Sequence, residues 1–73
     1  MAGNSFYLPQ IIEAAEKTIS ALKPGIGVPA YREQLARVQK LLRYAKAIKG
    51  RCETEILLTI DEFDDVSEFY EID

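Results

Sequence analysis

The sequence predicts a small, mainly α-helical domain: a helical hairpin, then a short extended segment, then a C-terminal helix. Two runs, Pro9–Lys23 and Pro29–Lys49, repeat apolar residues at the spacing of an amphipathic helix. The stretch 23–28 between them contains proline and two glycines, which is typical of a turn. A helix-capping signal then precedes a third periodic run that starts near Ile60.

The first predicted helix runs from Pro9 to Lys23, after a short lead-in at residues 1–8. Proline suits the first turn of a helix, because its missing N–H has no intrahelical partner there. The apolar residues on one side of this helix are Ile11, Ile12, Ala15, Ile19 and Leu22. Pro24 ends the helix, since proline cannot continue it.

The second predicted helix, Pro29–Lys49, carries two different faces. Its apolar face consists of Tyr31, Leu35, Val38, Leu41, Leu42, Ala45 and Ile48. Its opposite face consists of Arg32, Ala36, Gln39, Lys40, Arg43, Lys46 and Ala47. An apolar stripe of this width indicates a helix packed on a core, with the other face exposed to solvent or to a partner. Gly50 is predicted to end the helix at the C′ position.

The segment after Gly50 admits two interpretations. From Thr54 to Ile60 apolar and polar residues largely alternate, which predicts a short extended segment near Glu55–Leu58. Its apolar residues also fit one helical arc, so a three-helix bundle is the alternative. If the segment is extended, no convincing partner strand is evident in the chain. Such a strand is either buried under the hairpin or accepts a strand from a partner protein.

A third helix is predicted from about Ile60 to Glu71. Thr59 and Glu62 have the spacing of a capping box, in which each side chain bonds the other residue's backbone N–H. The inner face of this helix is predicted to consist of Phe63, Val66 and Tyr70, with Phe69 beside them.

The amino-acid composition excludes several classes of function. Seventy-three residues make a single small domain, 1–73, and they include no histidine and one cysteine, Cys52. Imidazole chemistry and a thiolate metal cage are therefore excluded, and the acids at 61–65 lack the spacing of a calcium loop. We expect a non-enzymatic, cytoplasmic, monomeric protein without cofactor or metal. No stretch is apolar enough for a membrane span, and no signal peptide is evident.

Charge is distributed very unevenly along the chain, although the net charge is only −3. Residues 32–51 contain seven Lys/Arg and one acid, whereas residues 53–73 contain nine acids and no base. Two oppositely charged surfaces on one small scaffold favour a protein that is steered onto a partner. The sequence therefore predicts a protein-binding regulator.

Two groups of residues are predicted to contact the partner. The first group lies on the basic face of the second helix and consists of Arg32, Arg43 and Lys46. The second group is the extended segment, Glu55, Ile56, Leu57 and Leu58. A nucleic-acid-binding protein that uses the same basic face is the alternative. The acidic C-terminal third of the chain argues against nucleic-acid binding, because its carboxylates would repel a polyanion.

In size, bipolar charge and helical layout, the whole chain resembles the small transcription regulators encoded by Xanthomonas-infecting bacteriophages. This resemblance implies a protein that binds host bacterial RNA polymerase near the N-terminus of the β′ subunit. It also implies that the protein displaces the sigma factor, inhibits promoter-specific initiation and acts as an antiterminator. No shared motif assigns these roles to individual residues.

Overall fold

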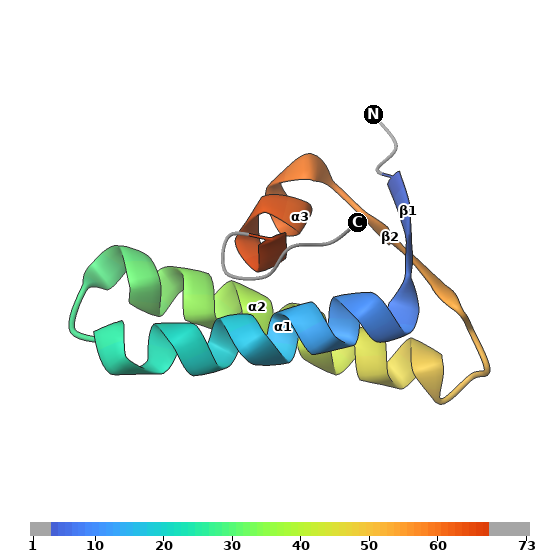
Figure 1. The fold of residues 1–73 in the computed structure, drawn as a ribbon, viewed down its shortest axis with the longest axis horizontal. Helices are drawn as coiled ribbons and strands as arrows, with labels where there is room; N and C mark the ends of the chain where they lie inside the picture. Colours follow the sequence, from blue (N-terminus) through green and yellow to red (C-terminus); the bar gives the residue numbers. More distant parts are fainter. Residues whose placement is uncertain (1–3, 68–73) are drawn as a thin grey trace.

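A computed structural model describes residues 4–67 of the protein. Its elements are β1 (Asn4–Tyr7), α1 (Leu8–Leu22), the 3₁₀ turn η1 (Lys23–Gly25), α2 (Pro29–Lys49), β2 (Glu55–Leu58) and α3 (Ile60–Ser67). Helices α1 and α2 lie side by side as a hairpin along the long axis, and α3 and the strands cover one side of it (Figure 1). The prediction of a mainly α-helical fold with a hairpin, an extended segment and a C-terminal helix is confirmed.

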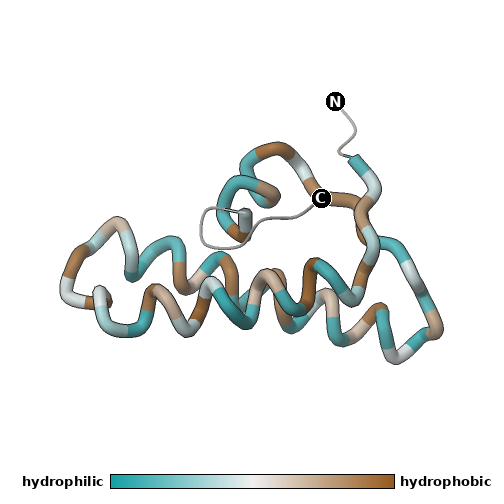
Figure 2. The backbone as a smooth tube through the Cα atoms, viewed as in Figure 1, coloured by the Kyte–Doolittle hydropathy of each residue, from teal (hydrophilic) through white to brown (hydrophobic). Residues whose placement is uncertain are grey.

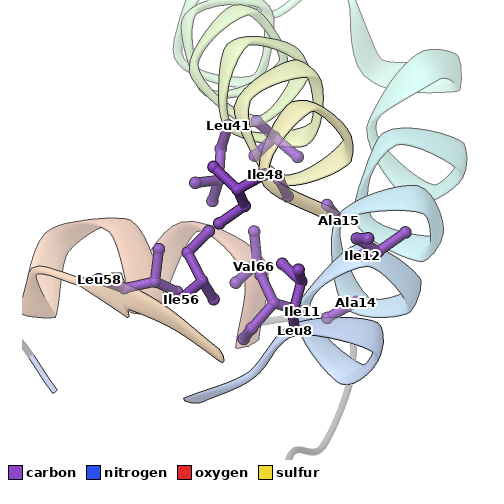
Figure 3. Packing of buried hydrophobic residues seen from close by; sticks show 12 residues of the cluster. Leu8, Ile11, Ile12, Ala14, Ala15, Leu41, Ile48, Ile56, Leu58 and Val66 are labelled. Carbon is purple, nitrogen blue, oxygen red and sulfur yellow. The ribbon is translucent and has the colours of Figure 1, made fainter. Parts of the chain in front are cut away.

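The hydrophobic core lies where the hairpin meets β2 and α3 (Figure 3). Apolar residues recur along both long helices, as Figure 2 shows, and each helix buries one such stripe. The core consists of Leu8, Ile11, Ile12, Ala14, Ala15, Val38, Leu41, Ala45, Ile48, Ile56, Leu58 and Val66. Every element except η1 therefore contributes to one core or packs against it through a partly buried side chain.

The buried face of α2 is rotated relative to the predicted one. Leu35 and Leu42 are only half-buried and Tyr31 is exposed, whereas Gln34 is buried. The reason is that α2 faces two neighbours, α1 and α3. Gln34 lies on the flank toward α3, where its Nε2 donates a hydrogen bond to the backbone oxygen of Asp65 at 2.9 Å.

Strand β2 has a partner within the chain, so the prediction that no partner strand exists is wrong. It pairs antiparallel with β1, in the register Asn4 to Leu58 and Tyr7 to Glu55. Backbone N–H of Leu8 extends the ladder by donating to the oxygen of Thr54 at 2.9 Å. The predicted lead-in thus contains a strand, which local sequence could not reveal because its partner lies about fifty residues away.

The end of α2 differs from the prediction that placed Gly50 at the C′ position. Gly50 keeps a helical backbone, and Cys52 adopts the left-handed conformation with φ of 65°. Backbone N–H of Cys52 bonds the oxygen of Lys49, and that of Glu53 bonds the oxygen of Ile48. These two bonds form a Schellman motif with Cys52 at C′, two residues later than predicted.

Helix α3 begins with the predicted capping box. The N–H of Thr59 donates to Glu62 Oε1 at 2.9 Å, and the N–H of Glu62 donates to Thr59 Oγ1 at 3.2 Å. Val66 is buried on the inner face as predicted. The predicted contributions of Phe69 and Tyr70, and of the rest of the helix to Glu71, lie outside the described residues.

Polar side chains of both long helices hold α3 onto the hairpin. Thr18 Oγ1, which is fully buried on α1, donates to the backbone oxygen of Val66 at 3.3 Å. On α2, the guanidinium of Arg37 donates to both carboxylate oxygens of Asp65, at 2.9 and 3.1 Å. Together with the Gln34 bond, these contacts fix the C-terminal turn of α3 against both helices.

Arg37→Ala is expected to lower the free energy of unfolding by less than about 1 kcal/mol, because the Arg37 side chain is exposed and its ion pair is screened by water. The hydrogen bond from Arg37 to Asp65, and then the attraction between their charges, raise the pKa of Arg37. Stability that depends on the Arg37 charge is present below the unfolded-state pKa and is lost only as pH rises through the higher folded-state value. Thermal unfolding of wild type and Arg37→Ala from neutral to mildly alkaline pH should therefore show a constant difference. A difference that vanishes in that range would contradict this.

Candidate protein-binding groove

Strand β2 has one edge that is not paired within residues 4–67. In an antiparallel ladder, hydrogen-bonded and non-hydrogen-bonded residue pairs alternate. The bond from Leu8 N–H to the Thr54 oxygen makes Leu8 and Thr54 a hydrogen-bonded pair. Phe6 and Ile56 therefore exchange hydrogen bonds, as do Asn4 and Leu58. The N–H and C=O groups of Glu55 and Leu57 consequently point away from β1, toward the opposite edge of β2.

A groove runs along this edge, between β2 and α2. Its larger part, about 520 Å³, is lined by Arg37, Lys40, Leu41, Tyr44, Leu57, Glu62 and Asp65. A neighbouring part, about 240 Å³, is lined by Tyr44, Ile48, Arg51, Glu53, Glu55, Ile56 and Leu57. The two parts share Tyr44 and Leu57, and neither is lined by a residue of β1, which places them on the unpaired edge of β2.

Apolar side chains in this groove are unusually exposed. Leu57 has 68% of its surface exposed and Tyr44 has 54%, although each lies beside buried core residues. The alternation of β2 explains Leu57: Ile56 and Leu58 point into the core, so Glu55 and Leu57 point outward. An exposed leucine and tyrosine next to an unpaired strand edge are typical of a surface that another chain covers.

Several charged groups of the groove are already engaged. Both oxygens of Asp65 accept bonds from Arg37, and Glu62 caps α3. Glu55 accepts a hydrogen bond from the hydroxyl of Ser5. The side chains of Lys40, Arg51 and Glu53 make no hydrogen bond or ion pair within residues 4–67.

The predicted contact residues of β2 separate into two pairs. Glu55 and Leu57 are exposed and line the groove, whereas Ile56 and Leu58 are 2% exposed and belong to the core, although Ile56 also borders the smaller part of the groove. The side chains of Ile56 and Leu58 are therefore occupied by this chain's own packing.

The predicted basic residues Arg32, Arg43 and Lys46 are exposed, but none of them lines the groove. Lys46 lies on the flank toward α1, where its Nζ is 3.6 Å from Glu16 Oε2. The structure thus does not join these three cations and β2 into one surface. The α2 residues that do face β2 include Lys40 and Tyr44, which were not predicted as contacts.

A sequence signal for Tyr44 did exist, because an aromatic residue lies among the charged and small residues of the α2 surface. The unpaired edge carried no such signal. It depends on β1 binding one specific side of β2, and the register of that pairing is a long-range property.

Residues 4–67 contain no group of three or more His, Cys, Asp or Glu side chains placed to hold a metal ion. None of the helices formed by these residues has the length and apolarity needed to cross a membrane.

Comparison with known proteins adds no relative: no protein-family model matches the chain, and no curated protein or solved structure is significantly similar to it.

Proposed function

We propose that the protein is a non-catalytic regulator that acts by binding another protein through the groove between α2 and β2. The observation that carries this proposal is the pair of exposed apolar residues, Leu57 and Tyr44, beside a strand edge with no partner in residues 4–67. Exposed strand edges of this kind pair readily with other chains.

Catalysis has less support. The sequence lacks histidine, and the groove contains no serine, threonine or cysteine to serve as a nucleophile. Its carboxylates at Asp65, Glu62 and Glu55 are engaged by Arg37, Thr59 and Ser5. Hydrogen-bonded surface carboxylates of this kind are poor general acids.

Bacterial RNA polymerase is the partner that we propose for this groove. The support is the resemblance in size, charge distribution and helical layout to phage regulators of host polymerase, which also predicts sigma-factor displacement and an antitermination activity. The bipolar charge supports steering onto a large assembly.

Nucleic-acid binding through α2 is the less favoured function. Of the three predicted contact cations, Lys46 is engaged by Glu16, which leaves Arg32 and Arg43. These two lie eleven positions apart on the helix, or about 16 Å at 1.5 Å per residue. Even with Lys40 between them, so few cations neutralise few phosphates, and little salt-dependent affinity for random duplex is expected in a gel-shift assay.

The test is a pull-down from bacterial lysate with the tagged protein and two matched variants. Leu57→Asp places a charge in the groove, and Ile60→Asp places one at an equally exposed apolar position outside it. Wild type and Ile60→Asp should retain polymerase subunits at low salt, and Leu57→Asp should lose them because an aspartate there cannot be desolvated cheaply.

Three outcomes are decisive. If the wild type retains a different protein and Leu57→Asp loses it, polymerase is the wrong target, but the proposed class, a protein-binding regulator, is right. Equal retention by both variants would place the binding surface elsewhere. If the wild type retains no protein at low salt, the proposed protein-binding function is wrong.

A further inference from the structure

We propose that a second surface of the protein, a pocket between α3 and β1, binds a partner segment in which lysine or arginine stands next to an apolar residue. This α3–β1 pocket is lined by Asn4, Phe6, Leu58, Thr59, Ile60, Phe63 and Asp64. None of these residues lines the groove between α2 and β2, so the two surfaces are separate. Two features of the pocket support this assignment: its apolar lining and the negative charge around it.

The α3–β1 pocket is largely apolar and open to solvent. Its volume is about 380 Å³, near the lower end of the range for ligand pockets, about 300–1,000 Å³. The stacked rings of Phe6 and Phe63 line it, and both are half-buried. Ile60 also lines it and, at 72%, is the most exposed large apolar side chain in residues 4–67. An apolar side chain of a partner would therefore cover surface that this chain leaves in water.

The surroundings of the pocket are acidic. Asp64 lines the pocket, and Asp61 and Glu62 line an adjoining hollow on α3 of about 390 Å³. None of these three carboxylates forms an ion pair within residues 4–67. The hydrogen bond that Glu62 accepts from the N–H of Thr59 comes from a neutral donor, so Glu62 keeps its charge.

Nearby cations do not balance this charge. Among the residues that line the pocket and the adjoining hollow, Arg37 is the one cation, and both carboxylate oxygens of Asp65 accept its hydrogen bonds. Four carboxylates against one guanidinium leave an excess of three negative charges. Residues 68–73 include three acids and no base, so they supply no cation either. Charge complementarity therefore favours a cationic partner.

Helix α3 places an apolar and an acidic side chain next to each other at the pocket. Ile60 and Asp64 are four residues apart, so they lie on the same face of the helix. The positive end of the helix dipole accounts for Asp61 and Glu62 in the first turn, but not for Asp64 in the next. An apolar side chain that enters the pocket beside Ile60 brings a neighbouring lysine or arginine to Asp64.

The chain itself does not supply such a segment. On the outer face of α2, Arg32 and Arg43 are each followed four residues later by an alanine, Ala36 and Ala47, whose methyl groups cannot fill the pocket. Residues 68–73 contain apolar side chains but are acidic, so the carboxylates around the pocket repel them. A basic segment of another protein satisfies both requirements.

The experiment is selection of short random peptides, displayed singly, on the immobilised full-length protein, with counter-selection on the double variant Asp61→Asn/Asp64→Asn. Enriched peptides should contain Lys or Arg next to a large aliphatic or aromatic residue. Fluorescence anisotropy with synthetic copies of these peptides measures their affinity. Amide chemical shifts of the isotope-labelled protein locate the site, and they should change most at Ile60, Phe63 and Asp64 and little at Leu57 in the groove.

Matched variants separate the charge from the apolar contact. Asp64→Asn should weaken the enriched peptides about two- to fivefold at low salt, the scale of one exposed ion pair, and Glu33→Gln on α2 should not. The effect of Asp64→Asn should shrink at high salt, because salt screens exposed charges. Ile60→Ala should weaken binding about three- to tenfold at both salt concentrations, because it removes apolar contact. All three side chains are exposed, so the variants should stay folded.

Several results would overturn the inference. Enriched peptides that are acidic or uncharged would do so, as would chemical-shift changes centred on Tyr44 and Leu57. Failure to enrich any peptide that the double variant loses would also overturn it. Sedimentation showing self-association that Asp64→Asn abolishes would overturn it in favour of a second copy.

The two proposals fail separately. If Leu57→Asp loses lysate proteins and no basic peptide is enriched, the groove binds a partner and the α3–β1 pocket does not. If basic peptides bind at the pocket and no lysate protein depends on Leu57, the pocket is a binding site and the groove is not.

Discussion

Leu58→Ala is expected to lower the free energy of unfolding by about 2–5 kcal/mol, whereas Leu57→Ala next to it should change it by less than about 0.5 kcal/mol. The two side chains are chemically identical and differ in exposure, 2% for Leu58 and 68% for Leu57. Truncation of Leu58 opens a cavity beside Ile56 and Val66, and truncation of Leu57 removes surface already in water. Urea unfolding followed by circular dichroism measures both changes.

The size of the first effect matters because the domain is small. Stabilities of folded domains are about 0.05–0.15 kcal/mol per residue, so the loss expected for Leu58→Ala is a large fraction of the total and should clearly lower the urea midpoint. The reverse order of effects, with the larger cost for Leu57→Ala, would mean that β2 is shifted by one residue, since such a shift exchanges the two faces of a strand.

Phe6→Ala and Phe63→Ala are each expected to cost about 2 kcal/mol, below the range for fully buried phenylalanines because both rings are half-buried. The rings stack with their centroids 4.6 Å apart and an interplanar angle of 9°. This stack joins β1 to α3, two elements that are distant in sequence. Removing either ring should therefore weaken the packing of both β1 and α3.

A double-mutant cycle separates the stack from simple loss of apolar area. The double variant should cost about 0.5–1.5 kcal/mol less than the sum of the single variants, the range measured for aromatic pairs. Tyr7→Ala is the control, because Tyr7 follows Phe6 in β1 and is 61% exposed. Strictly additive costs of the two phenylalanine substitutions would argue against the stack.

The helices and the start of α3 were predictable because their signals are local. Pro9 and Pro29 lie in first helical turns, apolar spacing marks the buried sides, and Thr59 with Glu62 forms the cap within four residues. The extended conformation of Glu55–Leu58 was also predictable from its alternation.

The sheet and the groove were not predictable because they depend on contacts between distant segments. Asn4–Tyr7 is too short to show alternation, and its value as a strand appears only when β2 is beside it. Gln34 and Arg37 are likewise explained by Asp65, about thirty residues away. The sequence therefore predicted that an extended β2 is either buried under the hairpin or paired with a partner protein, and it did not reveal that β1 pairs with one of its edges.

The pairing of β1 with β2 has a consequence for synthesis of the protein. Strand β1 is translated before the whole helical hairpin and β2 after it, so the ladder cannot close until Leu58 has left the ribosome. Before then β1 has no strand to pair with among residues 4–54, and Phe63, on which the ring of Phe6 stacks, emerges later still. The hairpin contacts are largely available earlier, since α1 and α2 are complete by Lys49. Residues 55–58 thus decide when residues 4–7 can pair, and the edge of β2 that faces α2 forms only after α2 is complete.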